Sequence, residues 1–178
     1  TWKSRGLGDV YKRQQLRTFA SVNVATGECL DVHHFAVLIG VGATTINAYV
    51  AEEAIVERHD RGLLPKLTLL EAVANYRKAV EDGLLKIMSK MGISVIASYR
   101  GGYNFEALGL SRSLVAKYFP PMSSRISGLG LTGIASRITE MHRKAYEVAD
   151  AILPVGGFFR YRRSGERHAF DGQLIHAM

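Results

Sequence analysis

Apolar side chains recur at steps of three and four residues between residues 68 and 91, which predicts one long helix with a single buried face. Thr68 and Glu71 have the spacing of a capping box and therefore mark its start. Gly92 stands just beyond Met91, the predicted last residue, where helices commonly end on a residue with positive φ. The apolar positions of this face are Val73, Tyr76, Val80, Leu84, Ile87 and Met91.

The pattern changes to alternation after Gly92. Ile93, Val95, Ala97 and Tyr99 alternate with serines, which predicts a strand over Ile93–Tyr99. The sequence Arg100-Gly101-Gly102 predicts a turn, and Asn104 is expected to cap a following helix with Glu106 in its first turn.

Helices and strands are predicted to alternate along the rest of the chain, which indicates an α/β fold with a small β-hairpin near the C-terminus. Leu30–Ile39 is a short apolar run that fits either a strand or a helix. Before the long helix, we expect a strand at Leu16–Val24 and a helix from Thr44 or Thr45 to near Gly62. After it, we expect a helix at Ser111–Tyr118 stopped by Pro120, a loop at Ser123–Gly130, and a helix from Thr132 with one apolar face made of Ile134, Ile138, Met141, Ala145 and Val148. The last expected elements are a hairpin of Phe158–Arg163 with Arg167–Phe170 and a helix capped by Asp171.

Composition and length narrow the class of protein. The chain has 178 residues, 47% hydrophobic and 22% charged, as expected for a globular domain. It has no apolar run long enough to span a bilayer and no visible secretory signal, so we expect neither a membrane partner nor export. The single cysteine, Cys29, suits a reducing cytoplasm.

The net charge of +7 raises the possibility of a nucleic-acid or other acidic partner. Residues 1–14 carry four basic side chains and one acidic one, and they read as a non-native linker or adaptor, which leaves +4 for the remainder. A second basic group, Arg160 to Arg167, flanks Ser164-Gly165. This position predicts a hairpin turn whose arginine side chains are exposed to solvent. We therefore expect no nucleic-acid binding. A basic interaction module remains an alternative, and it requires these arginines to share a face with Lys86 and Lys90.

Two glycine patterns resemble a dinucleotide site. Gly40-Val41-Gly42 follows an apolar run, and a stand-alone nucleotide-binding domain would require that run to be a strand of a parallel sheet. Gly128 to Gly133 has the spacing of the fingerprint, but two prolines and two serines stand where its strand should be. Glycine-permitted close contact is the expected role of the first pattern, and a loop leading into a helix that of the second.

No residue pattern indicates a metal site. The histidines lack the paired spacing of zinc ligands, and an iron–sulfur cluster needs about three or four thiolates where this chain has one. Cys29 follows a turn and is not expected to be a nucleophile. The six histidines are His33, His34, His59, His142, His168 and His176.

Four side chains gather where the predicted strand turns into the next helix: Ser98, Tyr99, Arg100 and Glu106. Such corners often carry function in α/β folds, which makes these residues the candidate cofactor-binding group. The structural alternative is an Arg100–Glu106 pair that stabilises the corner, and it is the interpretation we favour.

Long contiguous strings of this sequence resemble the large chain of glutamate synthase. They include LRTFASVNVATGECLDVHHFAVLIGVGATTINAYVAEE, NYRKAVEDGLLKIMSKMGISVIASYRGGYNFEALGLSRSLVAKYF, SRISGLGLTGIASRITEMHRKAYE and GGFFRYRRSGERHAFDGQLIHAM, and together they cover nearly everything from about Leu16 to Met178. One departure is Gly102-Tyr103-Asn104, where many members of the family read Ala-Gln-Ile.

The resemblance implies a cytoplasmic oxidoreductase of nitrogen metabolism that makes two glutamates from glutamine and 2-oxoglutarate. It implies FMN and a 3Fe-4S cluster in the parent enzyme, with electrons from NADPH through a small subunit that carries FAD and NADPH, or from ferredoxin. The chain is then expected to be a segment of a longer protein, inactive alone and serving as an inter-domain scaffold. Residues 15–64 would end a central-domain unit, and residues 65–178 would lead to the FMN-binding barrel.

We predict that residues 1–14 do not belong to the folded core, because they are basic and carry only Trp2 and Tyr11 as large anchors. Deleting residues 1–14 is expected to leave the thermal midpoint nearly unchanged, as is deleting residues 1–6 alone. A drop of many degrees in scanning calorimetry for the longer deletion would place the segment in the fold.

Overall fold

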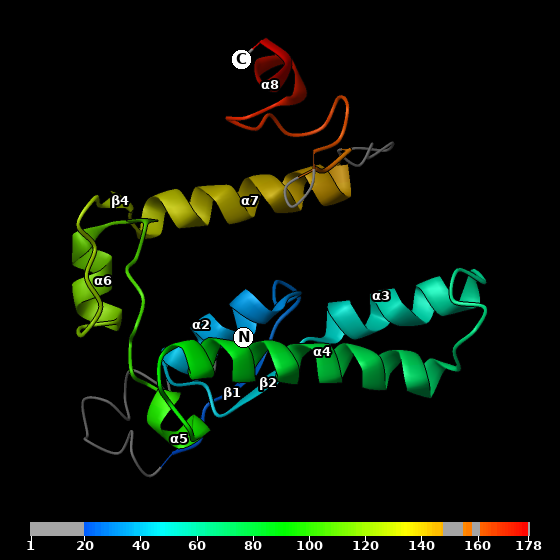
Figure 1. The fold of residues 1–178 in the computed structure, drawn as a ribbon. Helices are drawn as coiled ribbons and strands as arrows, with labels where there is room; N and C mark the ends of the chain where they lie inside the picture. The colour runs from blue at the N-terminus through cyan, green and yellow to red at the C-terminus, as the bar shows by residue number, and fades with distance from the viewer. Residues whose placement is uncertain (1–19, 148–154, 158–160, 178) are drawn as a thin grey trace. The chain divides into compact units, whose positions relative to one another are not determined.

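The computed structural model describes residues 20–147, 155–157 and 161–177, and its ribbon is shown in Figure 1. The chain forms two units, residues 1–130 and 131–178. The elements of the first unit are β1 (Asn23–Ala25), α2 (Val32–Gly40), β2 (Thr45–Asn47), α3 (Tyr49–Asp60), α4 (Leu69–Lys90), α5 (Ile96–Tyr99), β3 (Gly109–Leu110), α6 (Arg112–Tyr118) and β4 (Gly128–Leu129); those of the second are α7 (Leu131–Glu147) and α8 (Gly172–Ala177).

The first unit opens with a parallel β–α–β arrangement. β1 and β2 pair in parallel, with Asn23 opposite Thr45 and Ala25 opposite Asn47. Parallel neighbours need a crossover connection, and α2 supplies it. Asp31 caps α2, because its Oδ1 accepts from the His34 backbone N–H at 3.2 Å while His34 Nδ1 accepts from the Asp31 N–H at 3.4 Å. The predicted α/β class is confirmed, with two small parallel sheets.

Helix α4 packs against both α2 and α3 (Figure 1). Gly83 allows the close approach to α2, because a Cβ at this position would lie 2.6 Å from Val32 Cγ2. On the side of α3, the Arg77 guanidinium donates to Glu52 Oε1 at 2.8 and 3.1 Å. Helix α4 therefore packs against two helices, and α2 also contacts β2.

Two clusters of buried side chains lie on either side of α2. One contains Cys29, Ala48 and Ala51, with Phe35 and Tyr76 among the side chains around it. The other contains Ala36, Met88 and Tyr99, with Ile39, Leu84, Ile87, Ile93 and Phe105 around it. Of the apolar face predicted for α4, Leu84 and Ile87 pack against the second cluster and Tyr76 against the first, while Met91 is exposed.

The predicted ends of α4 are confirmed. The Thr68 N–H donates to Glu71 Oε2 at 2.8 Å and the Glu71 N–H to Thr68 Oγ1 at 3.3 Å, which completes the capping box. Gly92 has φ +69°, and the following N–H, of Ile93, donates to the Met88 carbonyl at 3.0 Å. The positive φ thus lets the chain turn back over the last helical turn.

The predicted strand Ile93–Tyr99 is wrong. Val95 is extended, but residues 96–99 form the short helix α5, which points the Tyr99 ring into the cluster with Ala36 and Met88. The Tyr99 hydroxyl donates to the Ala36 carbonyl at 3.1 Å. Burial of the Tyr99 ring therefore outweighs the strand preference indicated by the alternating apolar residues.

The helix expected after Asn104 does not form either. Phe105 instead packs on Gly40, and Glu106 forms a parallel bridge to Ser123. The next helix is α6, capped by the Ser111 hydroxyl, which accepts from the Leu114 N–H at 3.3 Å. The helix predicted over Ser111–Tyr118 is therefore confirmed.

The remaining short elements of the first unit agree with the predictions only in part. Thr44 and Thr45 do not cap a helix, because Thr45 pairs with Asn23 in β2 and α3 begins only at Tyr49. The ambiguous run Leu30–Ile39 is mostly helix α2. The predicted loop Ser123–Gly130 contains β4, which pairs in parallel with β3. The strand expected at Leu16–Val24 is β1 and starts at Asn23, with residues 16–19 outside the described part.

In the second unit the predicted hairpin is not found in the described residues, and Val148 of the predicted helix face lies outside them. The described residues of Phe158–Arg163 and Arg167–Phe170 form a turn about Ser164, φ +65°, without strands, while residues 158–160 lie outside the described part. The Gly165 N–H closes this turn by donating to the Arg162 carbonyl at 2.9 Å, and the Glu166 N–H donates to the Gly156 carbonyl at 2.8 Å. The helix expected from Thr132 is α7, and Asp171 caps α8 through the Leu174 N–H at 2.8 Å.

We predict that Gly92→Val destabilises the first unit by about 1 kcal/mol or more, since only the backbone conformation opposes a side chain there. An added Cβ would meet no atom within 4 Å, so no clash contributes. Gly92→Asn is the matched control, because asparagine tolerates positive φ and is expected to cost less. Equal urea midpoints for wild type and the valine variant would contradict the prediction.

Candidate functional site

The four residues of the predicted corner do not form one constellation. Tyr99 is fully buried, and burial raises the pKa of its hydroxyl. Ser98 and Arg100 are exposed beside it. Glu106 pairs with Arg125 at 2.7 and 2.8 Å, in place of the expected pair with Arg100. Hydrogen bonds from the Arg125 side chain hold the pKa of Glu106 below its usual value. Tyr99 is therefore a core residue, whereas Glu106 forms an ion pair that links two chain segments.

The turn after Tyr99 is fastened to the C-terminal end of α2. The Gly101 N–H donates to the Ile39 carbonyl, and the Tyr103 N–H to the Gly40 carbonyl, both at 3.0 Å. These bonds satisfy carbonyls that a helix end leaves without partners. Tyr103 takes a positive φ of 49° to make its bond. The backbone, and not the side chains, of Gly102-Tyr103-Asn104 therefore carries this contact.

The first glycine of each pattern lies against another part of the chain. Gly40 ends a helix and not a strand, and a Cβ on it would lie 2.4 Å from Phe105 Cε2. A Cβ on Gly128 would lie 2.2 Å from the Gly109 carbonyl oxygen. The space that a nucleotide-binding glycine keeps for the ligand is thus filled by the protein itself. Gly40 and Gly128 therefore do not have the open space that a phosphate-binding glycine needs, and close contact is the role that Gly40 has in this structure.

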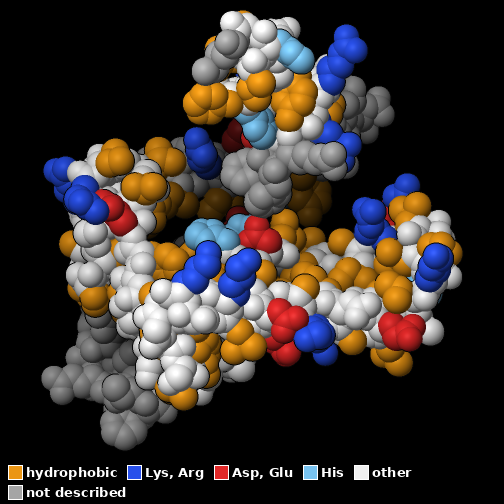
Figure 2. Space-filling model, in the orientation of Figure 1, with side chains coloured by type: hydrophobic (Ala, Val, Ile, Leu, Met, Phe, Trp, Pro, Cys, Tyr) orange, Lys and Arg blue, Asp and Glu red, His pale blue; other side chains and the backbone are white. Residues whose placement is uncertain are grey.

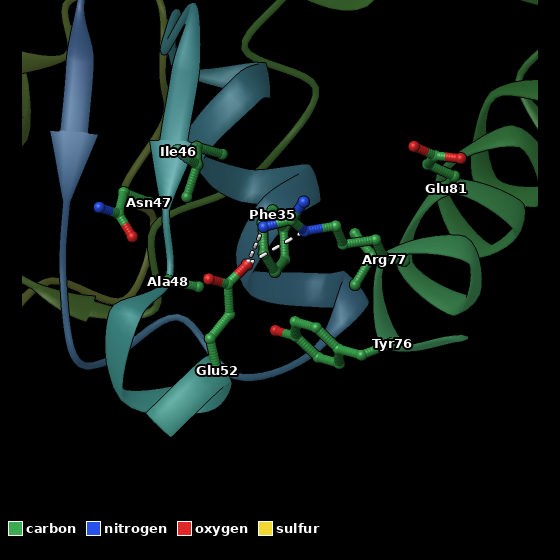
Figure 3. Close-up of a pocket in the computed structure, with 9 residues that line it drawn as sticks. Phe35, Ile46, Asn47, Ala48, Glu52, Tyr76, Arg77 and Glu81 are labelled. Carbon is green, nitrogen blue, oxygen red and sulfur yellow. Dashed lines mark hydrogen bonds and ion pairs between the residues drawn. The ribbon is translucent and has the colours of Figure 1, made fainter. Parts of the chain in front are cut away.

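A cavity of about 470 Å³ opens at the carboxyl end of β2 (Figure 3). Arg77 and Glu52 lie across it from each other on α4 and α3 and are joined by the ion pair. Tyr76 of α4 also lines the cavity, and its hydroxyl donates to the Leu30 carbonyl at 3.2 Å. Parallel sheets often place ligands at this end of their strands. The Arg77 guanidinium is already paired with the Glu52 carboxylate, so the described lining residues offer no unpaired cation to an anionic ligand. The remaining lining residues are Phe35, Ile46, Asn47, Ala48, Val80 and Glu81.

Sequence reasoning missed Glu52 and Arg77. They lie 25 residues apart on different helices, and no local spacing connects them. Only the way α3 and α4 pack brings the two side chains together.

Cys29 lies in the core with 1% of its surface exposed. Burial, with a smaller effect of the nearby Asp31 carboxylate, raises the pKa of its thiol to about 11. Thiolates are the reactive form of cysteine, so this thiol is chemically quiet at neutral pH.

The histidines serve local structure where their contacts are described. His34 belongs to the cap of α2, and His33 meets the edge of the Phe105 ring at 6.3 Å between centroids. Within residues 20–147, 155–157 and 161–177, no group of three His, Cys, Asp or Glu side chains is placed to hold a metal ion. In the same ranges, no helix has the length and apolar character to cross a membrane.

Charged side chains of both signs are interspersed over α3 and α4 (Figure 2). Lys78 pairs with Asp82 at 3.0 Å and Arg61 with Glu57 at 3.2 Å. Arg160 of the alternative basic module lies outside the described residues, and the other arginines of that group belong to the second unit. The described part of α4 gives that alternative no support.

The β–α–β arrangement and the long capped helix α4 define an α/β segment. Residues 7–111 match the family model described as "Glutamate synthase central domain", which covers more than half of the chain. The chain therefore belongs to the glutamate synthase family.

Curated relatives extend the similarity beyond residue 111. The "Glutamate synthase [NADPH] large chain" of Azospirillum brasilense is 63% identical over 93% of this chain, which corresponds to 11% of that relative. The "Ferredoxin-dependent glutamate synthase" of Pyropia yezoensis is 42% identical over 92% of the chain and 11% of its own length. The "Glutamate synthase [NADH]" of Saccharomyces cerevisiae is 38% identical over 92% of the chain and 8% of its own length. The chain thus spans about a tenth of the length of these relatives.

We predict that iodoacetamide at pH 8 alkylates Cys29 about a hundredfold more slowly in the native chain than in urea, because the pKa rises from 9.0 to about 11. The native rate is expected to climb with pH until about 11, as the thiolate forms. Mass spectrometry of quenched samples measures both rates. A native rate close to that in urea would show that the thiol is accessible and ionised.

Proposed function

We propose that this chain serves as a scaffold segment within the large chain of a glutamate synthase. The observation that carries the proposal is the closure of both glycine turns by Phe105 and Gly109, which leaves the described residues with contacts to one another in place of a cofactor. The Glu106–Arg125 and Glu52–Arg77 pairs fit the same role, because each fastens one chain segment to another.

The whole enzyme is proposed to convert glutamine, 2-oxoglutarate and a reductant into two glutamates in the cytoplasm. FMN and a 3Fe-4S cluster would be held by other parts of the large chain, because Gly40 and Gly128 do not have the open space that a phosphate-binding glycine needs. The relatives' names include NADPH-, NADH- and ferredoxin-dependent enzymes. The donor is therefore proposed as one of these three, with a small flavoprotein subunit or ferredoxin as the partner.

The proposed division of labour follows the chain order. Residues 15–64 would complete a central-domain unit, and residues 65–178 would lead from it toward a flavin-binding barrel. The candidate corner Ser98, Tyr99, Arg100 and Glu106 would then be structural, with Tyr99 as its buried anchor. Residues 1–14 remain proposed as a non-native extension, although the family match begins at residue 7.

We predict that the purified chain is colourless and leaves the fluorescence of added FMN unchanged at micromolar concentrations. The physical reason is that a flavin site needs a phosphate cradle and groups that tune the ring, and both glycine turns are filled. A stoichiometric yellow protein, or quenching abolished by Arg100→Ala, would move the cofactor site into this chain.

A chimera tests whether this chain can replace the matching segment of a glutamate synthase large chain. Residues 16–178 are exchanged into the Azospirillum brasilense large chain in place of the matching segment, and glutamate formation is assayed with its own reductant. Retained activity is expected at 63% identity. A matched chimera with Gly40→Leu, whose side chain would collide with Phe105, is expected to be inactive or insoluble. A native chimera that folds but makes no glutamate would contradict the proposal.

A further inference from the structure

We draw no further inference here: the strongest candidate, the cavity of about 470 Å³ at the carboxyl end of β2, belongs to the site already described, its Glu52–Arg77 ion pair already joins α3 to α4, and nothing in the structure shows what ligand would occupy it.

Discussion

The contact between α2 and α4 is the interaction on which the first unit depends. Gly83 removes the side chain that would otherwise hold the two helices apart at Val32. Because α2 then lies close, it contributes Phe35 to the cluster around Cys29 and Ala36 to the cluster around Tyr99. The β1–β2 pair is joined through the same helix, and the turn at Gly101 is fastened to its end. One short helix therefore couples the sheet, the long helix and the loop that follows it.

Elements whose causes are local could be predicted from the sequence. The ends of α4 follow from Thr68, Glu71 and Gly92, and the start of α6 follows from Ser111, because each residue acts on backbone groups within a few positions. The region from Ile93 to Glu106 could not be predicted in this way. Tyr99 takes its conformation from Ala36, 63 residues earlier, and no alternation within seven residues reports that contact.

The candidate site was harder to predict than the fold, because its polar side chains have distant partners. Glu106 pairs with Arg125, 19 residues away, although Arg100 is nearer in sequence. The turn at Gly40 was correctly interpreted as close contact, since the residues after it lack the features of a nucleotide site. Its partner, Phe105, could not be named from the sequence. Motif spacing thus excluded a function more easily than it assigned contacts.

The same physical argument separates α4 from α7. Both helices have an apolar stripe that is visible in the sequence, but α4 packs against α2, and its Met88 lies in one cluster with Ala36 and Tyr99. The stripe of α7 buries none of its residues in the described structure, while its charged face pairs with itself.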